Sequence, residues 1–198
     1  MPVAIVRMVL GPLQNNVYLL ADEESKDAVL IDPSFEPERQ AAEIWQRGWN
    51  LRQIWLTHGH FDHTQGAAGL RKLFTPAQLV GMHPEAQAWA LAYREKLNFG
   101  YQMTPLPDVD IRFFHGQQLS LNPEADAPIV EVREVPGHSP GSVIFYCAQA
   151  GAAFVGDAIF RESIGRTDLP GGDYPALLAA IRTQIFTLPE DTMLLPGH

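Results

Sequence analysis

Short apolar runs, separated by turn-forming residues, dominate the pattern of hydrophobic and polar positions. Apolar runs of about four to eight residues bounded by Gly, Pro, Asn or Asp are typical of strands. The expected strands are Val3–Leu10, Val17–Ala21, Ala28–Ile31, Gln53–Leu56, Leu79–Met82, Ile111–Phe114, Gln118–Leu121, Ile129–Val135, Ser142–Cys147, Ala152–Val155 and Met193–Leu195.

Helices are expected between groups of these strands. Glu38–Arg47 follows Pro37, which suits a first helical turn, and it stops at Gly48. The other expected helices are Gly66–Phe74, Pro84–Leu97 and Pro175–Phe186, and residues 98–110 are expected to be irregular. Strict alternation of strand and helix is absent, so the pattern favours two sheets with helices packed outside them.

Composition sets the broad class. The chain has 198 residues, which suits one domain spanning 1–198, and a formal net charge of −9, which disfavours nucleic acid as a partner. Cys147 is the single cysteine, so no intrachain disulfide forms and the cytoplasm is the default compartment. The first ten residues do not resemble a signal peptide, and no apolar run approaches the roughly 20 residues that cross a membrane.

The densest polar cluster follows the expected strand Gln53–Leu56. It reads Thr57-His58-Gly59-His60-Phe61-Asp62-His63. Imidazole nitrogens and carboxylate oxygens suit zinc, iron and manganese. In an extended segment His58 and His60 point the same way, whereas Asp62 and His63 diverge unless the chain turns. One tight loop is therefore expected to supply donors to two neighbouring metals.

Three further donors share one pattern, because each follows an apolar strand and stands next to a glycine. They are found in Val135-Pro136-Gly137-His138, Phe154-Val155-Gly156-Asp157 and Leu195-Pro196-Gly197-His198. Strand ends that meet at one edge of a sheet position side chains rigidly. The pattern therefore predicts that these residues converge on the cluster at 57–63.

With these donors in this order, the chain resembles the metallo-β-lactamase superfamily from end to end. The H-x-H-x-D-H motif of that family is matched by His58, His60, Asp62 and His63, the later donors by His138, Asp157 and His198, and the early Asp by Asp32. The resemblance implies an αββα sandwich of two mixed sheets with helices on the outer faces. It also implies two divalent metal ions, with zinc expected first and iron or manganese as alternatives.

The resemblance implies a role for each matching residue. His58, His60 and His138 hold the first metal, Asp62, His63 and His198 hold the second, and Asp157 spans both. Asp32 and Thr57 orient ligands without binding metal. Asp62, which can pass a proton beside the attacking water, and Asp157 are the expected catalytic residues.

Within the superfamily the chain is similar to the single-domain glyoxalase II group, the hydroxyacylglutathione hydrolases. The stretches that carry this similarity are Gly11-Pro12-Leu13-Gln14-Asn15-Asn16, Pro136-Gly137-His138-Ser139-Pro140-Gly141-Ser142 and Gly165-Arg166-Thr167-Asp168. The resemblance implies cleavage of a thioester such as S-lactoylglutathione by hydroxide formed at the metals. Arg166 is the expected substrate-binding residue, for a carboxylate. The resemblance also implies that Asp168 replaces a glutathione-contacting tyrosine of that group, and a single domain without the group's C-terminal helical domain is expected.

Several alternatives stay open. Persulfide dioxygenases share this fold and use one iron, so that reaction is the main rival. A nuclease or another hydrolase of the same fold, including a β-lactamase, and a non-catalytic metal module are further alternatives. For Arg166, the alternative is an ion pair with Asp168 that shapes the loop.

Other residues are expected to be structural. His83 is interpreted as a helix cap or surface residue, His115 as structural and Cys147 as a buried packing thiol. The aromatic residues Tyr93, Phe99 and Tyr101 are candidates for a pocket wall or for ordinary core positions.

Overall fold

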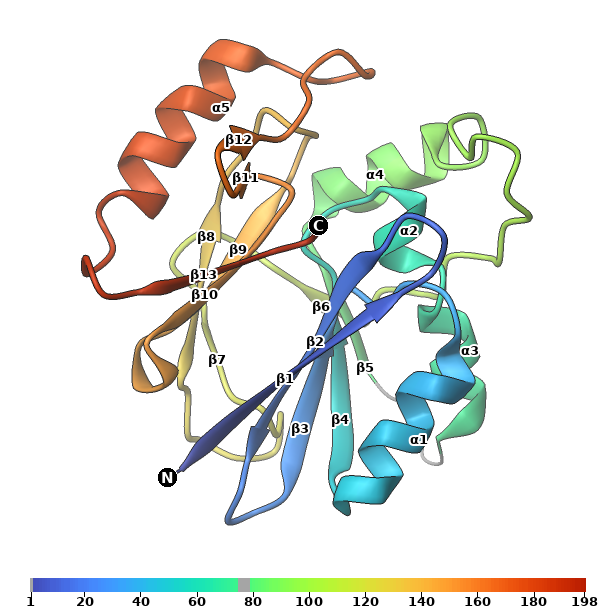
Figure 1. The fold of residues 1–198 in the computed structure, drawn as a ribbon, viewed down its shortest axis with the longest axis vertical. Helices are drawn as coiled ribbons and strands as arrows, with labels where there is room; N and C mark the ends of the chain where they lie inside the picture. Colours follow the sequence, from blue (N-terminus) through green and yellow to red (C-terminus); the bar gives the residue numbers. More distant parts are fainter. Residues whose placement is uncertain (1, 75–78) are drawn as a thin grey trace.

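The computed structural model describes residues 2–74 and 79–198 as two β-sheets packed face to face with helices outside them (Figure 1). The first sheet has the strand order β1-β2-β3-β4-β5-β6. Its strands are β1 (Val3–Leu10), β2 (Asn15–Asp22), β3 (Asp27–Ile31), β4 (Asn50–Trp55), β5 (Leu79–Met82) and β6 (Ile111–Arg112). Pairing is antiparallel from β1 to β3 and parallel from β3 to β6, so the sheet is mixed.

The second sheet is also mixed and has the order β13-β10-β9-β8-β7. Its strands are β7 (Gln118–Leu119), β8 (Val130–Glu134), β9 (Val143–Cys147), β10 (Ala152–Gly156) and β13 (Met193–Pro196). The β10–β13 pair is parallel and the other pairs are antiparallel. A separate ribbon is formed by β11 (Ile159–Phe160) and β12 (Ser163–Ile164).

The helices cover the outer faces of the two sheets (Figure 1). The outer face of the first sheet packs against α1 (Pro37–Arg47) and α3 (Ala67–Leu73). Ile44 of α1 and Leu70 of α3 are buried in the apolar core between these helices and the sheet. The second sheet packs against α5 (Tyr174–Ala180), which continues as the π-helical turn η2 (Ile181–Ile185). A 3-10 turn, η1 (Ala148–Ala150), joins β9 to β10.

A third apolar core fills the space between the sheets. Trp55 of β4 lies 5.2 Å from Phe145 of β9 between ring centroids, and Phe113 contacts both rings, at 6.2 Å and 5.3 Å. All three side chains are fully buried. Two mixed sheets joined by this core and covered by outer helices confirm the expected αββα sandwich.

Element boundaries differ from the sequence prediction where tertiary contacts intervene. The helix α4 (Pro84–Tyr93) ends four residues before the predicted Leu97. The guanidinium of Arg94, the next residue, donates hydrogen bonds to the hydroxyl of Thr64 and the carbonyl of Thr104. Beyond Arg94 the backbone forms turns, in which the N–H groups of Lys96 and Leu97 both donate to the Tyr93 carbonyl.

Two short elements near the metal-donor motif were not predicted. The short helix α2 (Phe61–Thr64) begins inside the motif itself, where the sequence suggested only a turn. The second is the β11–β12 ribbon after Asp157, which was missed because its strands have two residues each. Separately, the strand predicted to reach Phe114 ends at Arg112, because the Phe114 N–H donates to the side chain of Gln117.

The topology brings five strand ends to one edge of the sandwich. β3 leads to Asp32, β4 to Thr57, β8 to His138, β10 to Asp157 and β13 to His198. In Figure 1 the C-terminus accordingly lies beside α2, between the two sheets. None of the helices in the described part of the chain is sufficiently long and apolar to cross a membrane.

The aromatic core between the sheets should dominate stability. We expect Phe145→Ala to lower the free energy of unfolding by about 3–5 kcal/mol, because a cavity opens between two rigid sheets. The matched control is Phe186→Ala, whose ring is 65% exposed and whose loss should cost less than about 0.5 kcal/mol. Urea denaturation of both chelator-treated variants measures the difference, and equal losses would contradict this account.

Candidate metal centre

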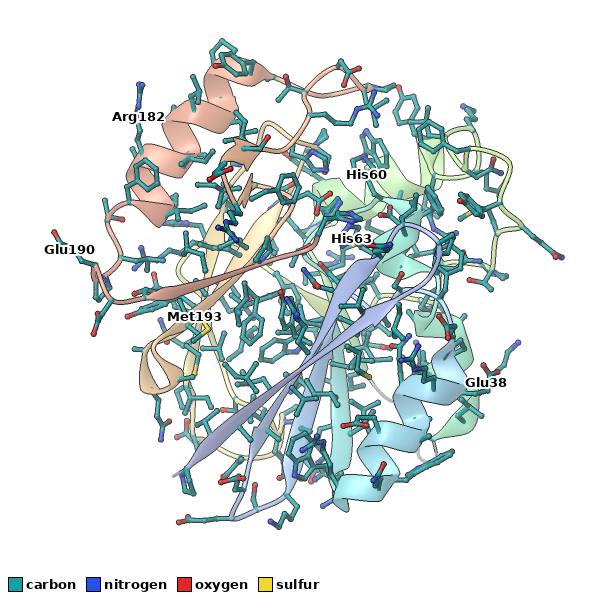
Figure 2. All side chains as sticks on the ribbon, viewed as in Figure 1. Glu38, His60, His63, Arg182, Glu190 and Met193 are labelled. Carbon is teal, nitrogen blue, oxygen red and sulfur yellow. The ribbon has the colours of Figure 1, made fainter. Side chains whose placement is uncertain are left out.

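The loop after β4 turns the donor motif into two differently oriented halves. His60 has extended dihedral angles, φ −66° and ψ 147°, and is the N-cap of α2. Asp62 and His63 therefore lie in the first helical turn, which aims both side chains toward the same edge of the sheets. Figure 2 shows His60 and His63 close together between the sheets, whereas Glu38 and Arg182 point outward.

A first group of donors surrounds the Nδ1 atom of His60. The Nε2 atoms of His58 and His138 lie 3.0 Å and 2.8 Å from it. Oδ2 of Asp157 lies 3.7 Å from Nε2 of His138, and these four residues form a cluster with converging ligand atoms. The expected approach of His58 to His138 is observed, with their ring centroids 5.0 Å apart.

A second group of donors surrounds Oδ2 of Asp62. Nε2 of His198 lies 3.2 Å from this oxygen and Nε2 of His63 lies 3.4 Å from it. Asp157 borders this group too, because its Oδ1 is 3.4 Å from His63 Nε2 and its Oδ2 is 3.7 Å from His198 Nε2. The structure thus places Asp157 between two donor groups.

Four of the five histidines have an acceptor on the nitrogen that faces away from the cluster. The Nδ1 contacts are His58 to Thr57 Oγ1 at 2.9 Å, His63 to Asp32 Oδ2 at 3.1 Å, His138 to Arg166 O at 2.9 Å and His198 to Leu13 O at 3.1 Å. Such outer contacts place the proton on Nδ1 and leave Nε2 free to bind a metal. The rings are therefore oriented inward before any metal binds.

Asp32 connects the two groups without offering a free oxygen. Its carboxylate accepts hydrogen bonds from the N–H of Thr57 at 2.7 Å and from the hydroxyl of Thr57 at 2.6 Å. It also contacts His63, and its φ of 52° lies in the left-handed region, which non-glycine residues rarely adopt. Asp32, His58 and His63 are close enough to form a further cluster, but these bonds occupy the Asp32 oxygens.

Burial keeps the imidazoles of the first group neutral. Desolvation lowers the pKa of all three rings. The pKa of His58 falls well below its usual value, that of His60 falls to about 3, and that of His138 is also lowered. A neutral imidazole has a free lone pair, so protons compete weakly with a metal here. In the second group burial also lowers the pKa of His63, but the adjacent Asp157 and Asp62 carboxylates outweigh it and raise that pKa.

The donor atoms fit divalent metal ions. Five imidazoles and two carboxylates match zinc, iron or manganese. Oδ1 of Asp157 is buried without a hydrogen-bond partner among the described residues, which is unusual for a carboxylate oxygen. A cation between the groups would satisfy this oxygen, so the residues present fit a centre of one or two metals.

Two glycines leave the space that this packing requires. A Cβ on Gly197 would lie 2.4 Å from Oδ1 of Asp157 and 2.6 Å from a ring carbon of His63. A Cβ on Gly165 would lie 2.9 Å from Nδ1 of His138 and still closer to the Asp157 carbonyl. Both positions exclude side chains because the donors are packed directly against the backbone.

A cavity of about 410 Å³ opens over the donor groups. Its floor includes His60, Asp62, His138, Asp157 and His198. Its walls are mostly apolar, formed by Leu13, Phe61, Trp89, Leu97, Phe99 and Leu169, together with Arg94 and Arg166. A mostly apolar cavity with polar groups at its base is typical of a small-molecule site.

The structure settles how Arg166 is paired. Its Nε and Nη2 atoms donate to the two carboxylate oxygens of Asp168 at 2.7 Å and 2.8 Å. This hydrogen-bonded pair lowers the pKa of Asp168 to about 2. The Arg166 side chain is 53% exposed at the cavity wall, so the ion pair is weak and open to exchange.

Other residues near the site were partly anticipated. His83 is the N-cap of α4 and accepts from the Glu85 N–H, as expected for a cap. Cys147 is buried, and Phe99 lines the cavity. Tyr101 instead stacks on Phe61 with ring centroids 5.6 Å apart.

Three side chains at the site were not identified from the sequence. Trp89 packs edge-on against His60, at 4.7 Å between ring centroids, and Arg94 is a buried cation in the cavity wall. Asn15 is fully buried, and its amide donates to Asp62 at 2.8 Å. The signals for Asn15 were its place in the stretch Gly11–Asn16, which carries the family similarity, and a polar Asn-Asn pair immediately before an apolar strand, but neither pointed to Asp62.

Comparison with known proteins agrees with this geometry. A sequence model described as the metallo-β-lactamase superfamily matches residues 10–198. The hydroxyacylglutathione hydrolase GloC of Haemophilus influenzae is 35% identical over 196 residues, which cover 93% of this chain and 85% of that protein. The mitochondrial persulfide dioxygenase ETHE1 of Homo sapiens is 34% identical, with 98% of this chain and 68% of that protein covered.

A solved structure adds a metal-containing relative. The crystal structure of TTHA1623 in a di-iron-bound form matches with a TM-score of 0.82 and 37% sequence identity. The match covers 98% of this chain and 91% of that one. Relatives of similar identity therefore carry two different activity names, and the superfamily together with the donor cluster implies divalent metals.

Asp157 provides the sharpest test of the centre. We expect Asp157→Ala to reduce bound metal more than His198→Ala does, because Asp157 borders both donor groups and His198 borders one. The two variants are compared by their metal content after dialysis, measured by inductively coupled plasma mass spectrometry. Retention of full metal content by Asp157→Ala would contradict the shared position assigned to this carboxylate.

Proposed function

Since the chain belongs to the metallo-β-lactamase superfamily, we propose that it is a metal-dependent hydrolase that cleaves thioesters such as S-lactoylglutathione. The observation that carries the proposal is the pair of donor groups that share Asp157 at the floor of one cavity. The similarity to a hydroxyacylglutathione hydrolase supports the substrate class. A cytoplasmic location belongs to the same proposal.

In this proposal the two donor groups hold two divalent metals, with zinc preferred and iron or manganese as alternatives. His58, His60 and His138 hold the first, and Asp62, His63 and His198 hold the second. Asp157 borders both groups and would serve both metals, while Asp32 and Thr57 orient the ligands. When bound, the two cations would lower the pKa of a shared water toward 7 and stabilise the negative charge that develops on the substrate carbonyl.

The protein's own groups account for the rest of the reaction. Hydrolysis forms a carbon–oxygen bond from water to the acyl carbon and breaks the carbon–sulfur bond, releasing a carboxylate, a thiol and a proton to solvent. We assign to Asp62, at the cavity floor, the transfer of one proton of water to the departing thiolate. A thiolate leaves readily, so no strong acid is required beside the sulfur. The apolar wall of Phe61, Trp89 and Phe99 limits access of bulk water.

Arg166 is the proposed contact for a remote carboxylate of the substrate. A guanidinium binds a carboxylate through two parallel hydrogen bonds, as this one already does with Asp168. Both side chains are more than half exposed, so a substrate carboxylate can exchange with Asp168 at small cost. Asp168 then acts as an internal competitor for the substrate.

The Arg166–Asp168 pair leads to a kinetic prediction. We expect Arg166→Ala to raise KM for S-lactoylglutathione by roughly tenfold, because it removes a charge-assisted hydrogen bond. Asp168→Asn should lower the same KM, because it frees the guanidinium. Steady-state kinetics on S-lactoylglutathione and on a small thioester without a carboxylate measure both effects. If Arg166→Ala harms the two substrates alike, the residue shapes the loop and does not bind the carboxylate.

Persulfide dioxygenation is the second candidate, because a human persulfide dioxygenase is 34% identical to this chain. The complete Asp62, His63 and His198 group favours two metals and hydrolysis over a single iron. The decisive experiment loads the purified protein with zinc, manganese or iron, counts the bound metal, and measures both thioester hydrolysis and oxygen uptake with glutathione persulfide. Oxygen uptake with one iron and no hydrolysis would replace the hydrolase proposal with the dioxygenase.

A further inference from the structure

Asn15 is a buried polar residue at the start of β2 that the proposed reaction does not use. Its Nδ2 donates to Oδ2 of Asp62 at 2.8 Å. The same nitrogen lies 3.4 Å from Nε2 of His63 and 3.3 Å from Nε2 of His198. It therefore touches the inward-facing atom of every residue in the second donor group.

The distances within the second donor group match those between ligands of one metal. Tetrahedral zinc with bonds of about 2.0–2.1 Å separates its donor atoms by about 3.3 Å. Oδ2 of Asp62 lies 3.4 Å from Nε2 of His63 and 3.2 Å from Nε2 of His198, close to this separation. The Asn15 amide is a hydrogen-bond donor and not a ligand, so it acts on the group by holding Asp62. Among the described residues, the side-chain hydrogen bonds of Asn15 go to the second group, and none goes to the first.

The other end of the carboxamide has no partner of its own. Oδ1 of Asn15 is buried without a hydrogen bond among the described residues. Burial of an unpaired oxygen is unfavourable, so ordinary packing does not favour an asparagine here. The contact with Asp62 is therefore the interaction that sets the orientation of this side chain.

The start of β2 also holds the segment that carries His198. The backbone N–H of Asn16 donates to the Gly197 carbonyl at 2.8 Å, and its side chain donates to the Pro196 carbonyl at 3.0 Å. The Tyr18 hydroxyl donates to the same Pro196 carbonyl at 2.7 Å. One short stretch of β2 thus fixes two members of the second group, Asp62 through a side chain and His198 through the backbone.

We propose that Asn15 is a positioning residue of the second metal site, which holds the Asp62 carboxylate in the orientation that faces the metal. This inference rests on the two-metal part of the proposed function and does not depend on the substrate. Loss of a partner that orients a ligand typically weakens metal affinity about 10–100-fold. We expect that loss at the second site alone, because Asn15 contacts only its members.

The test compares Asn15→Leu with Gln40→Met in the 198-residue protein. Leucine and methionine resemble asparagine and glutamine in shape but donate no hydrogen bond. Gln40 is a matched control, because it is fully buried and its amide donates to the carbonyls of Ser34 and Phe35, which belong to neither donor group. The chelator-treated proteins are titrated with Zn²⁺ by calorimetry and with Co²⁺ by visible absorption. The wild type should bind two equivalents, and Asn15→Leu should keep the first affinity and lose about 10–100-fold in the second. Gln40→Met should unfold more readily yet keep both affinities.

The outcomes separate the two claims. A wild type that binds one equivalent would overturn both the two-metal assignment and the role of Asn15. Two equivalents of unchanged affinity in Asn15→Leu would overturn the role of Asn15 alone. Equal weakening of both sites, or equal weakening by Gln40→Met, would also overturn it. The first equivalent reports correct folding, and Asn15→Ala replaces Asn15→Leu if leucine prevents folding.

Discussion

Both donor groups depend on the hydrogen bonds that the Asp32 carboxylate accepts. It accepts two hydrogen bonds from Thr57, so it fixes the start of the donor loop relative to the end of β3. Because the Thr57 hydroxyl donates to Asp32, the Thr57 oxygen is free to accept a hydrogen bond from the Nδ1–H of His58. Asp32 also accepts a hydrogen bond from the Nδ1–H of His63. One buried carboxylate thereby orients a ring in each group, and its left-handed backbone conformation is the strain that accompanies this position.

The burial of so many polar groups limits what the site can be. Three carboxylates and five imidazoles are buried at one edge of the sandwich. Without partners, like charges among them would repel one another, and each group would lose its hydration without compensation. In the first group the protein meets this cost by keeping the rings neutral, since burial lowers their pKa values. In the second group the carboxylates favour positive charge, as the raised pKa of His63 shows. Divalent cations satisfy both arrangements at once.

The donor set was predictable from the sequence because its signals are local. His58 to His63 form one continuous motif, and His138, Asp157 and His198 each follow an apolar strand beside a glycine. The two-sheet fold followed from the same short strands. Asn15 was not predictable in this way, because it meets Asp62 across 47 residues of chain and no local pattern links them. The contact of Arg94 with Thr64, just after the end of α4, was likewise invisible to local patterns, because it spans 30 residues of chain.

The two donor groups differ in how they are held, and this difference bears on the chemistry of the fold. Two of the three histidines of the first group lie in one short loop, so local backbone geometry preserves most of it. The second group joins α2 to the end of β13, and the start of β2 supports both. Sequence change in β2 or β13 therefore alters the second group while leaving the first intact. Relatives named as a hydrolase and as a dioxygenase both lie near 35% identity. A first donor group that is determined locally and a second that depends on distant strands offer a physical route by which relatives of one fold come to carry different activity names.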